Sequence, residues 1–145
     1  MVIRAAQASA RITADQVSNI ESHGTGTKLG DPIEITSLCT VFDGRPASSP
    51  LMVGTVKTNI GHGESMAGIA GMLKAVLSLE KGRIPKHLHC ETLNPLISFG
   101  DVPVVIPQQT APWPAQFGRR ITGCCAYGFG GTNGHVILED APPPP

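Results

Sequence analysis

The sequence predicts a layered α/β protein, in which helices cover a sheet of buried strands. Helical and strand patterns alternate along the 145 residues, and the candidate strands are apolar and β-branched, as strands covered on both faces usually are. The unusual polar residues gather in three glycine-rich turns that follow candidate strands. Because α/β folds usually place their chemistry at strand ends, these turns are the candidate functional segments.

The first three expected elements are a helix, a strand and a second helix. Residues 1–12 have helical composition but lack a capping residue at the start, and residues 16–22 contain the β-formers of a short strand. In residues 31–42, Asp31 is expected to cap a helix and Glu34 to complete a capping box. Four apolar side chains share one face of this helix: Ile35, Leu38, Val41 and Phe42.

The middle of the chain is expected to form a strand and a long helix. Residues 51–60 are apolar enough for a strand covered on both faces, and residues 64–82 form a helix that Gly82 ends. This helix is apolar almost all round, which is typical of a helix packed inside a domain. Its broad apolar face consists of Met66, Ile69, Leu73, Val76 and Leu77.

The last third of the chain is richer in loops. Residues 82–118 contain many prolines, and one short strand is expected there, at 104–106. Residues 119–131 and 134–141 are expected to form two strands around a glycine turn. The domain is expected to span residues 1–140, and residues 141–145 to begin a proline-rich linker.

Composition excludes several classes of function. The formal net charge is zero, so the chain lacks the basic surface that nucleic-acid binding requires. No segment has the apolar length of a membrane helix, and residues 1–12 lack the features of a secretory signal, so we expect a cytoplasmic protein without membrane contact. The four cysteines have no framework spacing and are expected to be reduced thiols.

Common motifs for phosphate and metal binding fail on spacing. In "HGTGTKLGD", Lys28 is followed by Leu29, where a P-loop needs Ser or Thr. In "GFGGTNG", Asn133 stands at the third glycine of a dinucleotide fingerprint, and no βαβ unit follows. The donors in "HLHC" have no second cluster nearby, so no metal site is predicted.

Two histidines and a lysine are the strongest candidates for chemistry. His23 and His62 each follow a candidate strand, and parallel neighbouring strands would bring both imidazoles to one edge of the sheet. Two neutral imidazoles can donate hydrogen bonds to one developing oxyanion, which suits an enolate. Lys57 could act electrostatically or pair with a carboxylate, and Glu64 is the nearest carboxylate in sequence.

Structural roles are the alternative for each of these residues. A lone histidine or lysine at a strand end is more often a satisfied turn residue or a solvated charge than a catalyst. Thr25 and Thr27 could merely satisfy turn amides, and Phe129 could belong to the core. Two histidines that each lie in a polar, glycine-rich turn are harder to explain in this way.

Long motifs in a fixed order resemble a known family. "ESHGTGTKLGDPIE", "VKTNIGHGESMAGIAGMLKAVLSLEKGRIP", "LHCETLNP" and "YGFGGTNGHVILEDAP" are similar to the C-terminal half of a β-ketoacyl synthase, specifically the ketosynthase domain of a type I polyketide synthase. The resemblance extends over nearly the whole chain. It implies a thiolase-like layered αβαβα fold, of which this chain would be the C-terminal half, and a homodimer of the complete ketosynthase.

The resemblance also implies an activity and residue roles. The family joins an acyl thioester to a malonyl unit by decarboxylative Claisen condensation, in polyketide or fatty acid biosynthesis, with substrates carried on the phosphopantetheine arm of acyl carrier protein and no tightly bound cofactor. By motif, His23 and His62 would hold the thioester oxygen of the enolate, with Lys57 supporting them. Thr25 and Thr27 would bind the phosphopantetheine arm, while the Phe129 amide would contribute to the oxyanion hole.

The nucleophile of the family has no counterpart here. It belongs to a "TACSS"-like turn of the N-terminal half, and none of the four cysteines has such a setting: Cys39, Cys90, Cys124 and Cys125. We therefore expect no condensation by this chain alone. Two alternatives stay open: a degenerate ketosynthase that binds acyl carrier protein or sets chain length without condensing, and a freestanding interaction module.

Overall fold

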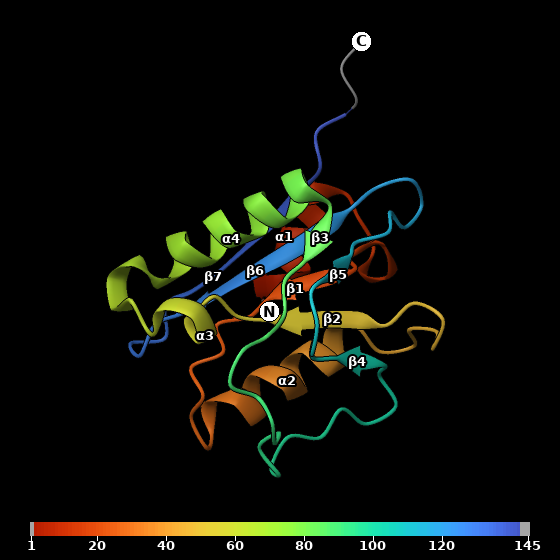
Figure 1. Ribbon diagram of the computed structural model, residues 1–145. Helices are drawn as coiled ribbons and strands as arrows, with labels where there is room; N and C mark the ends of the chain where they lie inside the picture. The colour runs from red at the N-terminus through yellow and green to blue at the C-terminus, as the bar shows by residue number, and fades with distance from the viewer. Residues whose placement is uncertain (1, 143–145) are drawn as a thin grey trace.

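A five-stranded, mostly parallel sheet organises the protein, as a computed structural model that describes residues 2–142 shows (Figure 1). The strands lie in the order β4-β2-β1-β6-β7. Strand β1 pairs in parallel with both β2 and β6, and β7 runs antiparallel to β6 at one edge. The strand bounds are β1 Asn19–Glu21, β2 Leu51–Gly54, β4 Val104–Val105, β6 Ile121–Tyr127 and β7 Asn133–Glu139.

Helices cover both faces of this sheet, which confirms the predicted layered α/β architecture. Helices α1 (Val2–Ala10) and α2 (Gly30–Val41) share one core with the strands, while α4 (Ala67–Lys81) packs on β6 and β1 from the other side (Figure 1). Successive strand side chains alternate between the layers. Ile20 therefore joins the core of α1 and α2, whereas Glu21 reaches Lys74 on α4.

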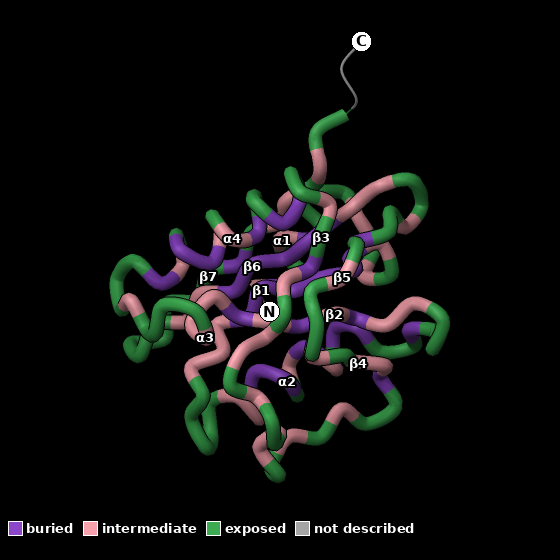
Figure 2. Tube along the Cα trace, in the orientation of Figure 1, coloured by how far each residue is buried: buried purple, intermediate pink, exposed green. Residues whose placement is uncertain are grey.

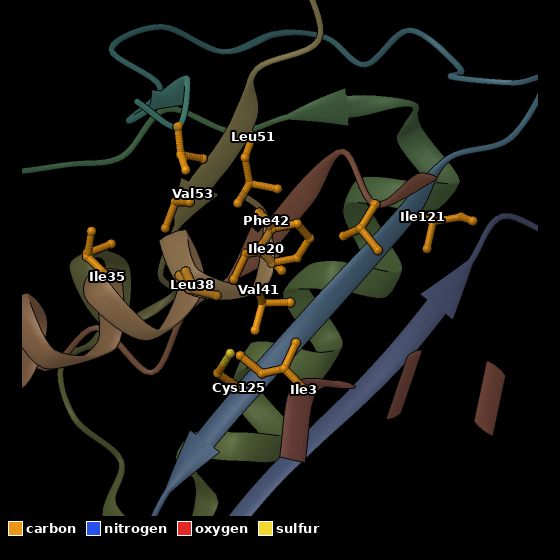
Figure 3. Close-up of a cluster of buried hydrophobic side chains, with 12 residues drawn as sticks. Ile3, Ile20, Ile35, Leu38, Val41, Phe42, Leu51, Val53, Ile121 and Cys125 are labelled. Carbon is orange, nitrogen blue, oxygen red and sulfur yellow. The ribbon is translucent and has the colours of Figure 1, made fainter. Parts of the chain in front are cut away.

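The main core lies between the sheet and the layer of α1 and α2. Figure 3 shows its side chains converging from both helices and from the strands. All four residues of the predicted apolar face of α2 belong to it: Ile35, Leu38, Val41 and Phe42. Full burial of such a side chain contributes roughly 1.5–3 kcal/mol, so this face fixes α2, and with it the turn that precedes α2, against the sheet.

The large apolar side chains of the predicted broad face of α4 are exposed, so the prediction that this face is packed inside is wrong for this chain. Small residues face the sheet instead, among them Ala70, Gly71 and Ala75, because α4 lies close to the strands there. The outer face of α4 carries the exposed side chains of Ile69, Leu73, Val76 and Leu77, and Met66 directly before the helix is exposed as well. Figure 2 shows buried and exposed segments alternating along α4. Gly82 ends the helix as predicted, and it does so in a left-handed conformation.

The strand predicted over residues 51–60 is shorter, and its second half is a helix. Strand β2 ends at Gly54, and α3 (Lys57–Ile60) follows. The Val56 N–H donates to the Glu21 carboxylate and not to a neighbouring strand, so the strand does not continue. In the helix that follows, the carbonyl of Lys57 accepts the Gly61 N–H at 2.9 Å. The short 3₁₀ helix η2 (Glu64–Met66) then leads into α4.

The predicted caps of α2 are also wrong. Helix α2 begins at Gly30, and neither carboxylate caps it in the expected way. The Asp31 carboxylate accepts the Gly26 N–H at 3.0 Å, while that of Glu34 accepts the N–H groups of His23 and Gly24. Both side chains reach back to the preceding turn because its amides have no strand partner.

A small second sheet was not predicted from the sequence. Strands β3 (Arg83–Ile84) and β5 (Ala111–Pro112) pair antiparallel, and Trp113 behind them is buried with Ile84 and Leu79. The expected glycine turn between β6 and β7 is confirmed. The linker prediction falls largely on residues 143–145, outside the described residues. Within residues 2–142, no helix has the length and apolar character needed to cross a membrane.

Candidate active site

The two predicted histidines meet at the carboxyl edge of the sheet. His23 lies two residues after the end of β1, and His62 lies between α3 and η2. Their ring centroids are 5.5 Å apart, with the ring planes at 86° to each other. The parallel pairing of β1 with β2 brings the two turns together, as the sequence predicted, although α3 intervenes between β2 and His62.

A backbone contact fixes the proton position on His62. The Glu64 N–H donates a hydrogen bond of 2.8 Å to His62 Nδ1. A neutral imidazole whose Nδ1 accepts a hydrogen bond carries its proton on Nε2. His62 can therefore present an N–H donor to a ligand at its exposed edge. Glu64, the donor of this hydrogen bond, has a φ of 48°, an unusual value for a non-glycine residue.

His23 is neutral for a different reason. Burial lowers the pKa of His23 below its ordinary value of 6.5, and the positive charge of Lys57 lowers this pKa further. The ring also lies 5.7 Å from that of Tyr127, measured between centroids. His23 thus remains an uncharged imidazole at neutral pH, and such a ring can donate to an anionic oxygen without requiring a counter-ion.

Glu34 holds the backbone of the His23 turn. One carboxylate oxygen accepts the His23 N–H at 2.8 Å, and the other accepts the Gly24 N–H at 2.9 Å. Gly24 has a φ of 43°, and a Cβ there would lie 2.9 Å from the side chain of Thr55. Burial raises the pKa of Glu34, while the two hydrogen bonds oppose the rise. The position of His23 therefore depends on a buried side chain eleven residues further along the chain.

Lys57 faces carboxylates other than the one expected. No ion pair joins Lys57 to Glu64 in residues 2–142, so the structure does not form that predicted pair. Burial lowers the pKa of Lys57, and the nearby charges of Glu21 and Glu34 oppose this shift. The ammonium thus stands near both buried carboxylates of the site. Glu64 contributes its backbone N–H to His62 instead.

Thr25 and Thr27 lie in the turn between His23 and α2. Their hydroxyl oxygens are 3.2 Å apart, and the Thr27 oxygen also accepts the Gly30 N–H at 3.1 Å. A cavity of about 380 Å³ is lined by Thr25, His23 and Tyr127. The Thr27 hydroxyl satisfies a turn amide, while Thr25 also borders space that a ligand could occupy.

His23 also lines a second cavity. It has a volume of about 440 Å³, and His23, Glu64 and Tyr127 are among the residues that line it. Phe129 does not line it: this residue lies in the turn between β6 and β7, and its side chain is fully exposed. The structure therefore brings His23, His62 and Lys57 together, while the exposed side chain of Phe129 follows Gly128, which lines the same cavity as His23.

Sequence reasoning missed the buried residues that lie next to the two histidines and Lys57. Glu21, at the end of β1, is 3% exposed and binds Lys74 of α4, with 2.7 Å between Oε2 and Nζ. The signal was present, since a carboxylate next to apolar strand residues must find a partner if it is buried. The roles of Glu34 and Tyr127 required the tertiary structure.

The cysteines of β6 are not activated. Burial raises the pKa of Cys124 to about 12, and the nearby carboxylate of Glu21 adds to the rise. Burial also raises the pKa of Cys125, whose sulfur lies 3.2 Å from Nδ1 of the buried His135. A thiolate is the reactive form of cysteine, so neither is a nucleophile at neutral pH. Within residues 2–142, no cluster of three His, Cys, Asp or Glu residues could hold a metal ion.

The structure is thus an α/β sheet that carries two adjacent imidazoles at its carboxyl edge, where folds of this class usually place functional groups. The sequence model described as "Beta-ketoacyl synthase, C-terminal domain" matches residues 1–91. The chain belongs to the β-ketoacyl synthase family, and it corresponds to the C-terminal part of a polyketide synthase ketosynthase domain with a thiolase-like fold.

Relatives of known sequence and structure agree with this assignment. The chain is 49% identical over 139 residues to a phenolphthiocerol/phthiocerol polyketide synthase from Mycobacterium tuberculosis, a match that covers 95% of the chain but 7% of the relative. An oxazolomycin ketosynthase domain from Streptomyces albus superposes with a TM-score of 0.88 at 37% identity, over 99% of this chain and 26% of that one. Ketosynthase twelve of the bacillaene polyketide synthase from Bacillus amyloliquefaciens gives 0.89 at 34% identity, over 97% and 25%.

Proposed function

We propose that this chain is part of a β-ketoacyl synthase that catalyses decarboxylative Claisen condensation of an acyl thioester with a malonyl-type extender. The observation that carries the proposal is the pair of neutral imidazoles, His23 and His62, with ring centroids 5.5 Å apart. Loss of carbon dioxide from a malonyl thioester leaves an enolate, whose negative charge develops on the thioester oxygen. One N–H donor from each ring would stabilise that oxygen with little reorganisation.

The other predicted residues take supporting roles in this proposal. Lys57 keeps the site electropositive, and together with burial it holds His23 in the neutral form. Thr25 borders the cavity of about 380 Å³ where the phosphopantetheine arm of acyl carrier protein would approach, with Thr27 beside it. The exposed turn at Phe129 would contribute its backbone amide to the oxyanion hole for the acyl group once the rest of the enzyme surrounds it.

The nucleophilic cysteine would come from the N-terminal half of the ketosynthase. Both cysteines near the site are protonated thiols, and the chain spans about a quarter of the solved ketosynthases it matches. The exposed apolar face of α4, which includes Ile69, Leu73 and Leu77, is the surface we assign to that half. The complete ketosynthase would then act as a homodimer with acyl carrier protein. Leu73→Asp should prevent co-purification of separately expressed halves.

Decarboxylation of a malonyl thioester by a complete ketosynthase tests the proposal. Removal of either imidazole, in His23→Ala or His62→Ala, should lower the rate by roughly 100- to 1,000-fold, the usual cost of losing one oxyanion donor. Acylation of the cysteine in the other half should persist. A parent enzyme that binds acyl carrier protein but neither decarboxylates nor condenses would favour the degenerate ketosynthase instead.

A further inference from the structure

The two histidine turns are each held by a different buried carboxylate. Glu34 accepts the N–H groups of His23 and Gly24 and so fixes the first turn. In the second turn, the Glu21 carboxylate accepts the N–H of Val56, the residue that directly precedes Lys57 and α3. His62 lies two residues beyond the end of α3, so the contact at Val56 sets where this turn begins.

Glu21 is also bound from the opposite direction. Its second oxygen accepts a hydrogen bond from Lys74 Nζ at 2.7 Å, and the two side chains are 3% and 15% exposed. Lys74 belongs to α4, the helix that follows His62 and η2 in the chain. One carboxylate therefore holds both ends of the segment that carries His62: its start through Val56, and the helix after it through Lys74.

Close packing leaves this pair little freedom. A Cβ placed on Gly71 of α4 would lie 3.2 Å from Glu21 Cγ and 3.2 Å from Cys124 Sγ. Burial raises the pKa of Glu21, and Lys74 is the main influence that lowers it. Without Lys74 the carboxylate would be a buried, unpaired charge, which proteins avoid by protonation or by displacement of the side chain.

We propose that Glu21 and Lys74 are positioning residues for His62: their buried ion pair sets the backbone at Val56, and through it the distance between the two imidazole rings. Neither side chain contacts substrate in this role. The inference rests on the proposed decarboxylation chemistry, because the placement of His62 is what the pair controls.

Kinetics of a complete ketosynthase that contains this half test the inference. Lys74→Met should lower kcat for malonyl decarboxylation by roughly 10- to 100-fold, the range expected for a misplaced catalytic group. Acylation of the cysteine in the other half should change by less than about threefold. Lys74→Arg should restore most of kcat, because a guanidinium still donates to Glu21. Lys81→Met, an exposed lysine of the same helix, is the matched control.

The double variant Glu21→Met/Lys74→Met separates positioning from stability. It leaves no unpaired charge, so its melting temperature should approach that of the parent, while kcat stays low because the Val56 N–H has lost its acceptor. Recovery of kcat along with stability would overturn the inference, as would decarboxylation and acylation that fall together in Lys74→Met. A parent enzyme without decarboxylation would instead overturn the proposed function itself.

Discussion

Glu34→Gln is the sharpest test of how the His23 turn is held. The carboxylate of Glu34 accepts two backbone N–H groups, one on each oxygen, at 2.8 and 2.9 Å. Glutamine keeps nearly the same volume but has one acceptor oxygen, so its NH₂ group must face one of the two N–H donors. The turn then either loses a hydrogen bond or moves away from α2.

The magnitude follows from these two contacts. A hydrogen bond to a charged group contributes about 1.5–3 kcal/mol. Glutamine is neutral, so it also removes the desolvation cost of a buried charge, and this offsets part of the lost hydrogen-bond energy. We expect Glu34→Gln to lower the free energy of unfolding by about 1–2 kcal/mol, and a displaced His23 to slow malonyl decarboxylation by about tenfold.

Denaturant titration and decarboxylation kinetics of a complete ketosynthase measure both effects. Glu80→Gln is the matched control, because it makes the same chemical change at an exposed position of α4. If Glu34→Gln and Glu80→Gln behave alike in both assays, the two hydrogen bonds do not hold the catalytic turn and the reasoning fails.

Three further outcomes are expected. Burial lowers the pKa of His135 from 6.5 to about 4, so between these pH values the unfolded chain binds a proton that the folded chain does not. Stability should therefore fall by at most about 3 kcal/mol as the pH drops through this window, and urea titrations of His135→Phe should show a smaller fall. In Gly123→Ala, a Cβ would lie 2.5 Å from His135 Nε2, so we expect thermal unfolding to show a free energy of unfolding lower by about 1–3 kcal/mol. Gly130 has open space around it, so Gly130→Ala should differ little from the parent. Cys124→Ala should keep stoichiometric acylation of a complete ketosynthase, because burial raises the pKa of this thiol to about 12; mass spectrometry that locates the acyl group on Cys124 would contradict this.

The spacing of apolar residues predicted helices and strands well where a single apolar face of the element is buried. The apolar residues of α2 recur at helical spacing and are buried together, and β6 and β7 flank the expected glycine turn. It failed at α4, where the large apolar side chains of the predicted face are exposed and small residues face the sheet. Hydrophobicity marks which side chains avoid water, but not which neighbour covers them.

The sequence by itself determined the family and the layered α/β class, and it singled out His23, His62 and Lys57 as candidate residues, because these depend on residue types in local order. Only the tertiary structure decided which groups hold them: Glu34 for the first turn, and Glu21 with Lys74 for the second. The carboxylates that accept these backbone N–H groups are separated from them along the chain. Their pairing is set by strand order and helix packing, which no local pattern encodes.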